Sequence, residues 1–269
     1  MREYLFVFMS AIIALFTLAG SNPRPASAFG GGGCGEGACS SCHELKVEDA
    51  SKILGGLVGK VDRVDFSKVP GLYSVEVESK GKKYLVYVDF SEKFIISGNV
   101  IRIADRTNIT REKLINMRRV DPAIIPIGDA LVIGNPKAPK KIIVFTDPQC
   151  PYCKELHPEL KKVVKADPDI VFFIKLYPLR KIHPDSYRIA QAIVCEDSID
   201  LLEASFAGKK IPDPECESSV VDNTIALARK LGISSTPTMV LPDGRLAPGF
   251  MPAKDILRLI DGGDAGKNQ

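Results

Sequence analysis

The chain has 269 residues, of which 45% are hydrophobic and 26% are charged, so it can build real cores. Its formal net charge of +3 is close to neutral for this length. A net charge this small does not indicate nucleic-acid binding, because that function requires a clustered basic surface. The roughly 240 residues that follow an apolar leader suit two modest domains, on the usual prior of about 100 to 200 residues per domain.

The leader, residues 1–28, has the pattern of a signal peptide. Arg2 supplies a weak positive charge, residues 4–19 form an almost unbroken apolar run, and Ala26-Ser27-Ala28 is a small-x-small cleavage pattern. The run is short for a membrane-spanning helix, which needs about 20 residues, although an uncleaved anchor is the alternative. We therefore expect export into an oxidising space, in which the seven cysteines can form disulfides.

A segment rich in glycine and cysteine follows at residues 29–44. Within it, Cys39, Cys42 and His43 satisfy the C-x-x-C-H pattern that attaches c-type haem through two thioethers, with the histidine as axial ligand. Haem needs an apolar pocket, however, and the glycine-rich flank around Cys34 offers none. Three interpretations therefore stay open: covalent haem c, a disulfide among these cysteines, and a metal site.

Residues 45–108 predict a small α+β domain. The expected elements are one helix and three strands, at 47–58, 72–77, 83–90 and 94–104. The sequence Ser-Lys-Gly-Lys at 79–82 favours a hairpin turn between the first two strands. A polar helical segment at 109–120, which ends before Asp121-Pro122, indicates a linker over 109–134.

Residues 135–263 predict a second domain, of the α/β class, with a short tail at 264–269. The expected elements, in chain order, are a strand at 141–145, a helix at 151–166, a strand at 170–176, helices at 185–195, 199–207 and 219–231, a strand at 239–241, a turn at 242–245, a short strand, and a helix at 253–260. This is the order of a thioredoxin fold that carries an inserted helical subdomain.

Cys150-Pro151-Tyr152-Cys153 lies directly after the apolar run 142–145, so both cysteines fall at the first turn of a helix. A thiolate, not a thiol, performs disulfide exchange, and a helix N-terminus stabilises negative charge. We therefore expect Cys150 to be the attacking sulfur and Cys153 the resolving one. A zinc site uses the same spacing but needs a second ligand pair, and none lies nearby in the sequence.

Several stretches together resemble the periplasmic disulfide isomerases DsbC and DsbG. The segment 145–157, Phe-Thr-Asp-Pro-Gln-Cys-Pro-Tyr-Cys-Lys-Glu-Leu-His, is similar to their active-site segment. Thr236-Pro237 and residues 243–249 are similar to their cis-proline loop and closing hairpin, and residues 70–73 and 96–99 resemble their N-terminal dimerisation domain. The resemblance covers about residues 45–262 and leaves the glycine-rich segment outside.

The resemblance implies a V-shaped homodimer in which the N-terminal domains pair and the thioredoxin-like catalytic domains face a shared cleft. It also implies an enzyme that isomerises or reduces non-native disulfides of exported proteins, with a membrane dithiol as reductant and no required cofactor. In the resembled fold, Thr236 offers its backbone to a substrate strand beside a cis Pro237; an ordinary trans turn proline is the alternative. Pro151 and Tyr152 would tune the stability of the thiolate.

Further assignments concern side chains around the predicted site. Cys195 and Cys216 are placed like the second, structural disulfide of DsbC, and two buried free thiols or a second redox pair are the alternatives. Such a bridge contributes roughly 3 kcal/mol in the chain-entropy model. Asp147 is expected to be solvated or to cap a turn rather than to relay protons to Cys153. His157 is expected to serve helix packing rather than to contact the site.

Two other functional classes stay open. A haem-bearing electron-transfer protein would use the C-x-x-C-H motif, with the thioredoxin-like domain as electron acceptor. A chaperone would use only the dimer cleft. Cys150, Cys153 and Thr236-Pro237 together make a complete exchange site, so the sequence favours an enzyme.

Overall fold

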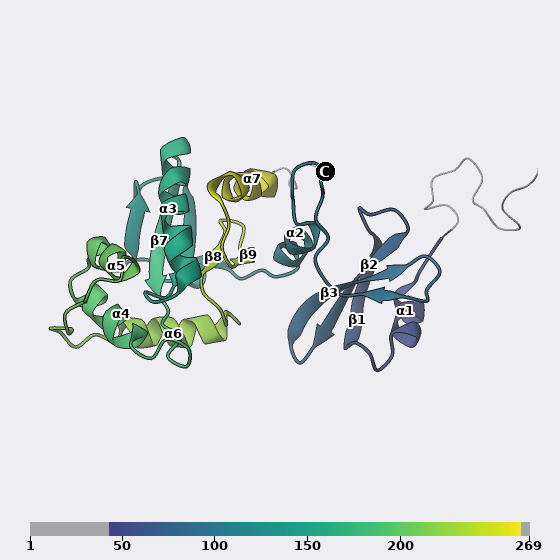
Figure 1. The fold of residues 1–269 in the computed structure, drawn as a ribbon, viewed down its shortest axis with the longest axis horizontal. Coiled ribbons are helices and arrows are strands. Elements are labelled where there is room, and N and C mark those ends of the chain that lie inside the picture. Colours follow the sequence, from purple (N-terminus) through teal and green to yellow (C-terminus); the bar gives the residue numbers. More distant parts are fainter. Residues whose placement is uncertain (1–42, 265–269) are drawn as a thin grey trace, which may run out of the picture. The chain divides into compact units, whose positions relative to one another are not determined.

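The computed structural model describes residues 43–264, and the first part of this range is an antiparallel four-stranded sheet with one helix (Figure 1). The strand order is β1-β2-β3-β4, and the bounds are α1 Val47–Ile53, β1 Lys60–Phe66, β2 Leu72–Ser79, β3 Lys82–Asp89 and β4 Ile95–Ile96. Alternate side chains of β2 form the core with α1: Tyr73, Val75 and Val77 are buried in one cluster with Ala50 and Leu54.

The turn between β2 and β3 is the expected hairpin. Ser79 pairs with Lys82, and the two residues between them, Lys80 and Gly81, have φ angles of 52° and 71°. Positive φ at both central positions is the geometry of a two-residue turn whose twist matches that of the strands it joins. The predicted turn at 79–82 is therefore confirmed.

Two expectations for this part need correction, and one strand was not expected at all. The helix expected at 47–58 ends at Ile53, because Gly56 adopts a φ of 79°, the conformation in which helices commonly end. Strand β1 was not predicted from the sequence, because a register shift between Val61 and Arg63 interrupts the alternation of buried and exposed side chains along it. The strand expected at 94–104 is reduced to β4, whose two residues are exposed at the edge of the sheet.

The second part is a mixed five-stranded sheet with the order β5-β7-β6-β8-β9 (Figure 1). Strands β6 and β7 pair in parallel, and the other neighbours in this sheet are antiparallel. The bounds are β5 Leu131–Gly134, β6 Lys140–Thr146, α3 Pro151–Ala166, β7 Ile170–Leu176, α4 Ser186–Cys195, α5 Ile199–Phe206, α6 Val220–Lys230, β8 Thr238–Val240, β9 Leu246–Pro248 and α7 Ala253–Asp264. From β6 onward this is the expected order, with helices inserted between β7 and β8.

Two hydrophobic clusters fill the space between this sheet and its helices. One gathers Leu156 of α3 and Ile256 of α7 with side chains of α4 and α5, and the other contains Ala228 of α6. Every residue of β7 is buried, as expected for an interior strand with both faces covered. Because α3 follows β6 after a short turn, the packing of this strand and helix fixes where Cys150 lies.

The second sheet begins earlier than expected. Strand β5 lies within the stretch 109–134 that was assigned to a linker, and it pairs with β7 from Leu131 opposite Ile174 to Gly134 opposite Val171. Four residues at a sheet edge are too few for an alternating pattern to identify them.

The helix expected at 109–120 is also shorter, and α2 spans Ile109–Asn116. The Asn108 side chain caps its start by accepting a hydrogen bond from the N–H of Arg111. The residues after α2 leave the helix because Val120 donates its N–H to the carbonyl oxygen of Gly244 at 2.9 Å. A short 3-10 helix, Pro122–Ile124, then leads toward β5.

No helix among residues 43–264 is long and apolar enough to span a bilayer. The predicted signal peptide and Cys34, Cys39 and Cys42 lie outside the described residues, so the expectations for them stay predictions.

The turn before β9 offers a test of this packing. Gly244 has a φ of 84°, and a methyl group there would meet the carbonyl oxygen of Val120. We expect Gly244→Ala to lower the free energy of unfolding by about 3 kcal/mol, because the left-handed backbone alone costs a side chain roughly 1–2 kcal/mol. Gly208→Ala is the matched control, since Gly208 has a φ of 75° but open space around it. Equal losses for the two variants in urea unfolding would contradict the close approach to Val120.

Candidate active site

Two free cysteines lie at the start of helix α3, shortly after strand β6. Cys150 is the N-cap residue with extended backbone, and Pro151 occupies the first helical position, where its missing N–H costs no hydrogen bond. Cys153 follows within the first turn. Cys150 is 5% exposed and Cys153 is 1% exposed, so Cys150 is the more accessible of the two.

The surroundings separate the acidities of the two thiols. The pKa of Cys150 falls to about 6, chiefly because the Cys153 thiol hydrogen-bonds to it, and the backbone N–H groups of Cys153 and Tyr152 add to the effect. Burial, and then the hydrogen bond to Cys150, raise the pKa of Cys153 far above its ordinary value. At neutral pH the negative charge of the pair therefore resides on Cys150, at the positive end of the helix.

The loop before strand β8 faces Cys150. Its Thr236–Pro237 peptide bond is cis, and Sγ of Cys150 lies 3.5 Å from the carbonyl oxygen of Thr236. Gly249 donates its N–H to the carbonyl oxygen of Pro237 at 2.7 Å, which ties the loop to the end of β9. The Thr236 side chain is buried beside this sulfur and helps to lower the pKa of Cys150. The structure thus brings Cys150 together with the two residues expected to bind substrate.

The dipeptide between the cysteines lies at the surface. Pro151 and Tyr152 are both exposed, Tyr152 to 60%. The Tyr152 backbone N–H helps to lower the pKa of Cys150. The two side chains therefore stand beside the reactive sulfur without belonging to the packed core.

A buried carboxylate belongs to the turn that precedes Cys150. Asp147 is 0% exposed and accepts three hydrogen bonds, from the N–H groups of Gln149 (2.8 Å) and Leu179 (2.7 Å) and from Nδ1 of His183 (2.9 Å). The expectation of a turn-capping aspartate is confirmed by the Gln149 bond. The alternative of a solvated side chain is wrong, because the loop after β7 covers the carboxylate.

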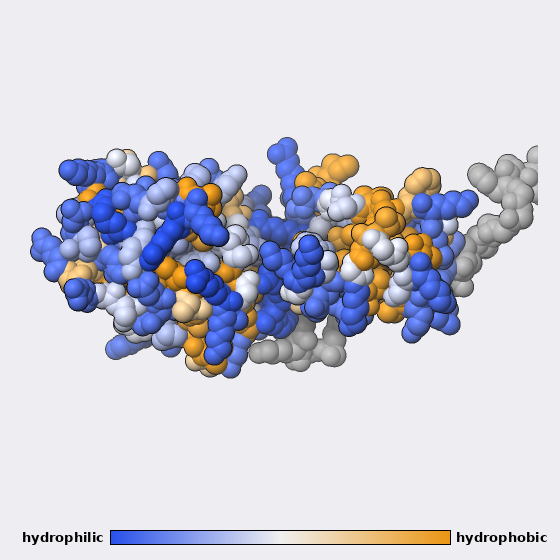
Figure 2. Space-filling view, turned by 90° about the horizontal axis from the view of Figure 1, so that it is seen from below, coloured by the Kyte–Doolittle hydropathy of each residue, from blue (hydrophilic) through white to orange (hydrophobic). Residues whose placement is uncertain are grey.

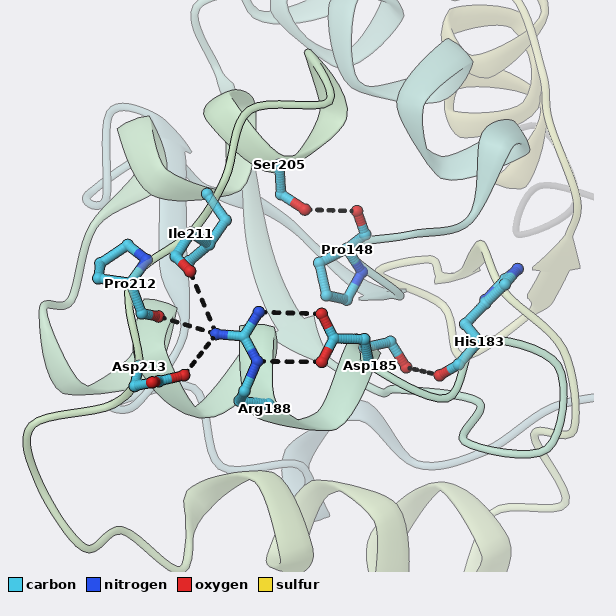
Figure 3. A network of polar contacts seen from close by, with 9 residues as sticks. Pro148, His183, Asp185, Arg188, Ser205, Ile211, Pro212 and Asp213 are labelled. Carbon is cyan, nitrogen blue, oxygen red and sulfur yellow. Dashed lines mark hydrogen bonds and ion pairs between the residues drawn. The ribbon is translucent and has the colours of Figure 1, made fainter.

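Sequence reasoning missed His183 and Ser205. His183 lies 36 positions after Asp147, and the parallel pairing of β6 with β7 is what brings them together. Ser205 of α5 donates its hydroxyl to the carbonyl oxygen of Pro148 at 2.9 Å (Figure 3). For His183, the expected order of elements was an available signal. In a thioredoxin fold the segments that follow two neighbouring parallel strands lie side by side.

The inserted helices are tied together by Arg188 and by a disulfide. Arg188 of α4 binds both carboxylate oxygens of Asp185, at 2.9 and 3.0 Å, and donates to the loop at residues 211–213 (Figure 3). Cys195, at the end of α4, is joined to Cys216 in a disulfide, so neither is a free thiol. Both links fix the loop between α5 and α6 against α4.

His157 packs between helices α3 and α5, as expected. It is 7% exposed, its Nε2 lies 3.0 Å from Oε1 of Glu203, and its ring centroid lies 5.5 Å from that of Phe206. Burial lowers the pKa of His157, although the hydrogen bond to Glu203 acts in the opposite direction. His157 therefore joins the active-site helix to the insertion.

Comparison with known protein families matches both parts of the chain. Residues 128–263 match the family model of a thioredoxin-like domain, and residues 46–111 match that of the disulfide bond isomerase protein N-terminal domain. The chain belongs to the thioredoxin-like DsbC/DsbG family. Both the mixed α/β thioredoxin-like domain and the separate N-terminal domain are those of this family.

Individual relatives carry matching names. The chain is 29% identical over 187 residues to the probable thiol:disulfide interchange protein DsbC of Bordetella avium and 26% identical over 180 residues to the thiol:disulfide interchange protein DsbC of Escherichia coli K12. These matches cover 69% and 66% of this chain. They span 64% of the Bordetella protein, slightly less than two thirds of its length, and 73% of the Escherichia coli protein.

A crystal structure of a disulfide interchange protein from Neisseria gonorrhoeae is 28% identical and superposes with a TM-score of 0.41, over 51% of this chain and 97% of that chain. At this score the superposition adds nothing to the family match.

The two DsbC/DsbG family domains leave the segment 29–44 unmatched. Of its predicted haem ligands, His43 is described and Cys39 and Cys42 are not. Within residues 43–264, no group of three or more His, Cys, Asp or Glu side chains is arranged to hold a metal ion.

The low pKa of Cys150 leads to a measurable pH dependence. Because the thiolate is the form that alkylates, the rate of iodoacetamide reaction with the reduced protein should rise with a midpoint at the pKa of about 6 and level off near neutrality. In Cys153→Ala the hydrogen-bonding thiol is removed and no donor takes its place, so the midpoint should move toward the ordinary cysteine value of about 8.5. Cys150→Ser, the control, should lose the fast reaction. A wild-type midpoint above about 8 would contradict the assigned acidities.

Proposed function

We propose that this DsbC/DsbG family member is an exported thiol:disulfide interchange enzyme that isomerises or reduces non-native disulfides in other exported proteins. The observation that supports it is a Cys150 thiol with a pKa of about 6, paired with a buried Cys153 thiol and in contact with the cis-proline loop. A thiolate present at neutral pH attacks disulfides, and a partner thiol kept protonated is held back until a mixed disulfide has formed.

The reaction begins when the Cys150 thiolate attacks one sulfur of a substrate disulfide. A bond forms between Cys150 and that sulfur, the substrate disulfide breaks, and the second substrate sulfur leaves as a thiolate. That thiolate attacks another disulfide of the same substrate, and the thiolate released there attacks the mixed disulfide. Cys150 leaves as a thiolate, so the substrate is rearranged with no net oxidation or reduction.

A substrate that rearranges slowly is reduced instead. Cys153 loses its proton and attacks the Cys150 sulfur, the mixed disulfide breaks, and the substrate sulfur leaves as a thiolate that takes up a proton. The substrate gains two electrons, and the enzyme loses two by forming the Cys150–Cys153 disulfide. An external dithiol must then reduce the enzyme before the next cycle.

The cis-proline loop holds the substrate during these steps. The backbone of Thr236 pairs with an extended stretch of substrate, in the manner of an added strand, next to the reacting sulfur. Pro237 has no N–H that would compete for the same hydrogen bonds.

The N-terminal domain pairs two copies of the chain in this proposal. Its surface carries large hydrophobic side chains (Figure 2). The most exposed of them is Ile103, at 94%. The other exposed large hydrophobic side chains of this domain are Ile53, Leu57, Phe66, Tyr84, Phe94, Ile95, Ile96 and Ile101. Exposed apolar side chains gathered in one region mark protein–protein contacts, and the short edge strand β4 leaves backbone groups available for pairing. A homodimer through residues 45–108 buries this surface.

Family membership and the predicted signal peptide support the proposed setting. The compartment is the periplasm, the substrates are misoxidised exported proteins, and the reductant is a membrane dithiol. The exchange steps need no cofactor. The comparisons give no support to a haem-bearing electron-transfer protein or to a chaperone as the main function.

Refolding of a protein with scrambled disulfides tests the enzyme activity. The wild type should restore the activity of the scrambled protein. Cys150→Ser should reduce the rate to the uncatalysed level, because the attacking sulfur is gone. Cys153→Ser should keep part of the isomerisation, since Cys153 acts only on mixed disulfides that rearrange slowly. Full activity in Cys150→Ser would overturn the proposal.

Light scattering tests the dimer. We expect the wild type to be a dimer at micromolar concentration, and Ile95→Asp/Ile96→Asp to be a monomer, because both side chains are exposed and charges there oppose burial. The monomer should keep the alkylation profile of Cys150 and lose most isomerisation. Lys80→Asp, on the exposed hairpin turn, is the control and should stay dimeric. A monomeric wild type would refute the dimer.

A further inference from the structure

One residue of the active-site turn is hydrogen-bonded to both cysteines through its backbone. Asp147 donates its N–H to Sγ of Cys153 at 3.4 Å, and its carbonyl oxygen accepts the N–H of Cys150 at 3.1 Å. The position of the Asp147 backbone therefore sets the position of a hydrogen-bond donor to the buried resolving sulfur.

The side chain of the same residue is anchored from outside the turn. Of the three donors to the Asp147 carboxylate, Gln149 belongs to the turn, whereas Leu179 and His183 belong to the loop after β7. Gln149 and Leu179 donate through their backbone N–H groups. Of the three donors, only His183 donates through its side chain. A carboxylate at 0% exposure has no solvent to replace a lost donor, and an unpaired charge in that position is costly.

His183 is itself held in place. Its N–H donates to the carbonyl oxygen of Leu179 at 2.9 Å, and its carbonyl oxygen accepts the hydroxyl of Ser186 at 2.8 Å. Figure 3 shows this carbonyl beside the ion pair of Asp185 with Arg188, at the start of α4. The imidazole that reaches Asp147 thus extends from a segment fixed by the inserted helices.

We propose that His183 is a positioning residue for the resolving step: through the Asp147 carboxylate, it holds the Asp147 N–H against Sγ of Cys153 while that sulfur carries negative charge. This inference rests on the proposed exchange reaction and adds to it a residue that acts through another.

The step concerned is the attack of Cys153 on the mixed disulfide. Cys153 gives up its proton, its sulfur bonds to Sγ of Cys150, and the substrate sulfur leaves with the electron pair and takes up a proton. Burial makes the Cys153 thiolate costly, and the Asp147 N–H and the Thr146 hydroxyl are donors that favour it. Without His183, the carboxylate turns toward another donor and the turn moves with it. The first attack, by Cys150, needs no Cys153 thiolate.

Mixed-disulfide kinetics with oxidised glutathione test the inference on the full, reduced protein. Acid quenching and mass spectrometry follow the glutathione adduct of Cys150 as it forms and as Cys153 resolves it. We expect His183→Ala to slow resolution by about tenfold, the low end for losing a charge-assisted hydrogen bond, with adduct formation changed by less than about twofold.

Two matched variants separate positioning from folding. His183→Asn places an amide nitrogen near the position of Nδ1, so it should resolve within about threefold of the wild-type rate. His183→Gln keeps the size and polarity but places its amide near the position of Nε2, so it should be as slow as His183→Ala. Lys181→Ala, on the exposed part of the same loop, should behave as the wild type. If His183→Ala does not fold, the Asn and Gln variants alone carry the comparison.

Wild-type resolution in His183→Gln, or equal slowing in the Asn and Gln variants, would overturn the positioning role. A wild type that forms no glutathione adduct at Cys150 would instead overturn the proposed exchange function, and this inference with it.

Discussion

The parallel pairing of β6 with β7 is the constraint on which the active site depends. Thr146 pairs with Leu176, so both strands end at the same edge of the sheet, the one formed by their carboxyl ends. The turn before α3 therefore lies beside the loop that follows β7. On the other side of β6, Thr238 pairs with Phe145, so the cis-proline loop reaches the same edge. Three segments that are distant in the sequence therefore meet at Cys150.

The inserted helices support this edge from the side. Ser205 of α5 binds the carbonyl oxygen of Pro148, and Glu203 of the same helix binds His157 and Lys161 of α3. One helix of the insertion thus contacts both the active-site turn and the active-site helix. Arg188 and the Cys195–Cys216 disulfide fix the loop that follows this helix. The insertion is therefore part of the support of the reactive thiols.

The sequence predicts most of this structure where the pattern is long or the motif is specific. Helix α3 and strand β7 have the expected bounds, because one is a long amphipathic stretch and the other a continuous apolar run. Strand β1 was missed because a bulge at Val61 hides its period, and β5 because it is short. His183 was missed for a different reason: nothing in its local sequence identifies its partner, and only tertiary structure brings it to Asp147.

The exposure of Pro151 and Tyr152 has a consequence for how such a protein can evolve. Both side chains face solvent, while Cys153 and the rest of the inward face of α3 carry the packing. Replacing either exposed residue removes no core contact, so it need not pass through an unstable intermediate. The two residues that flank the reactive sulfur can therefore change during evolution without changes in the buried residues that stabilise the fold.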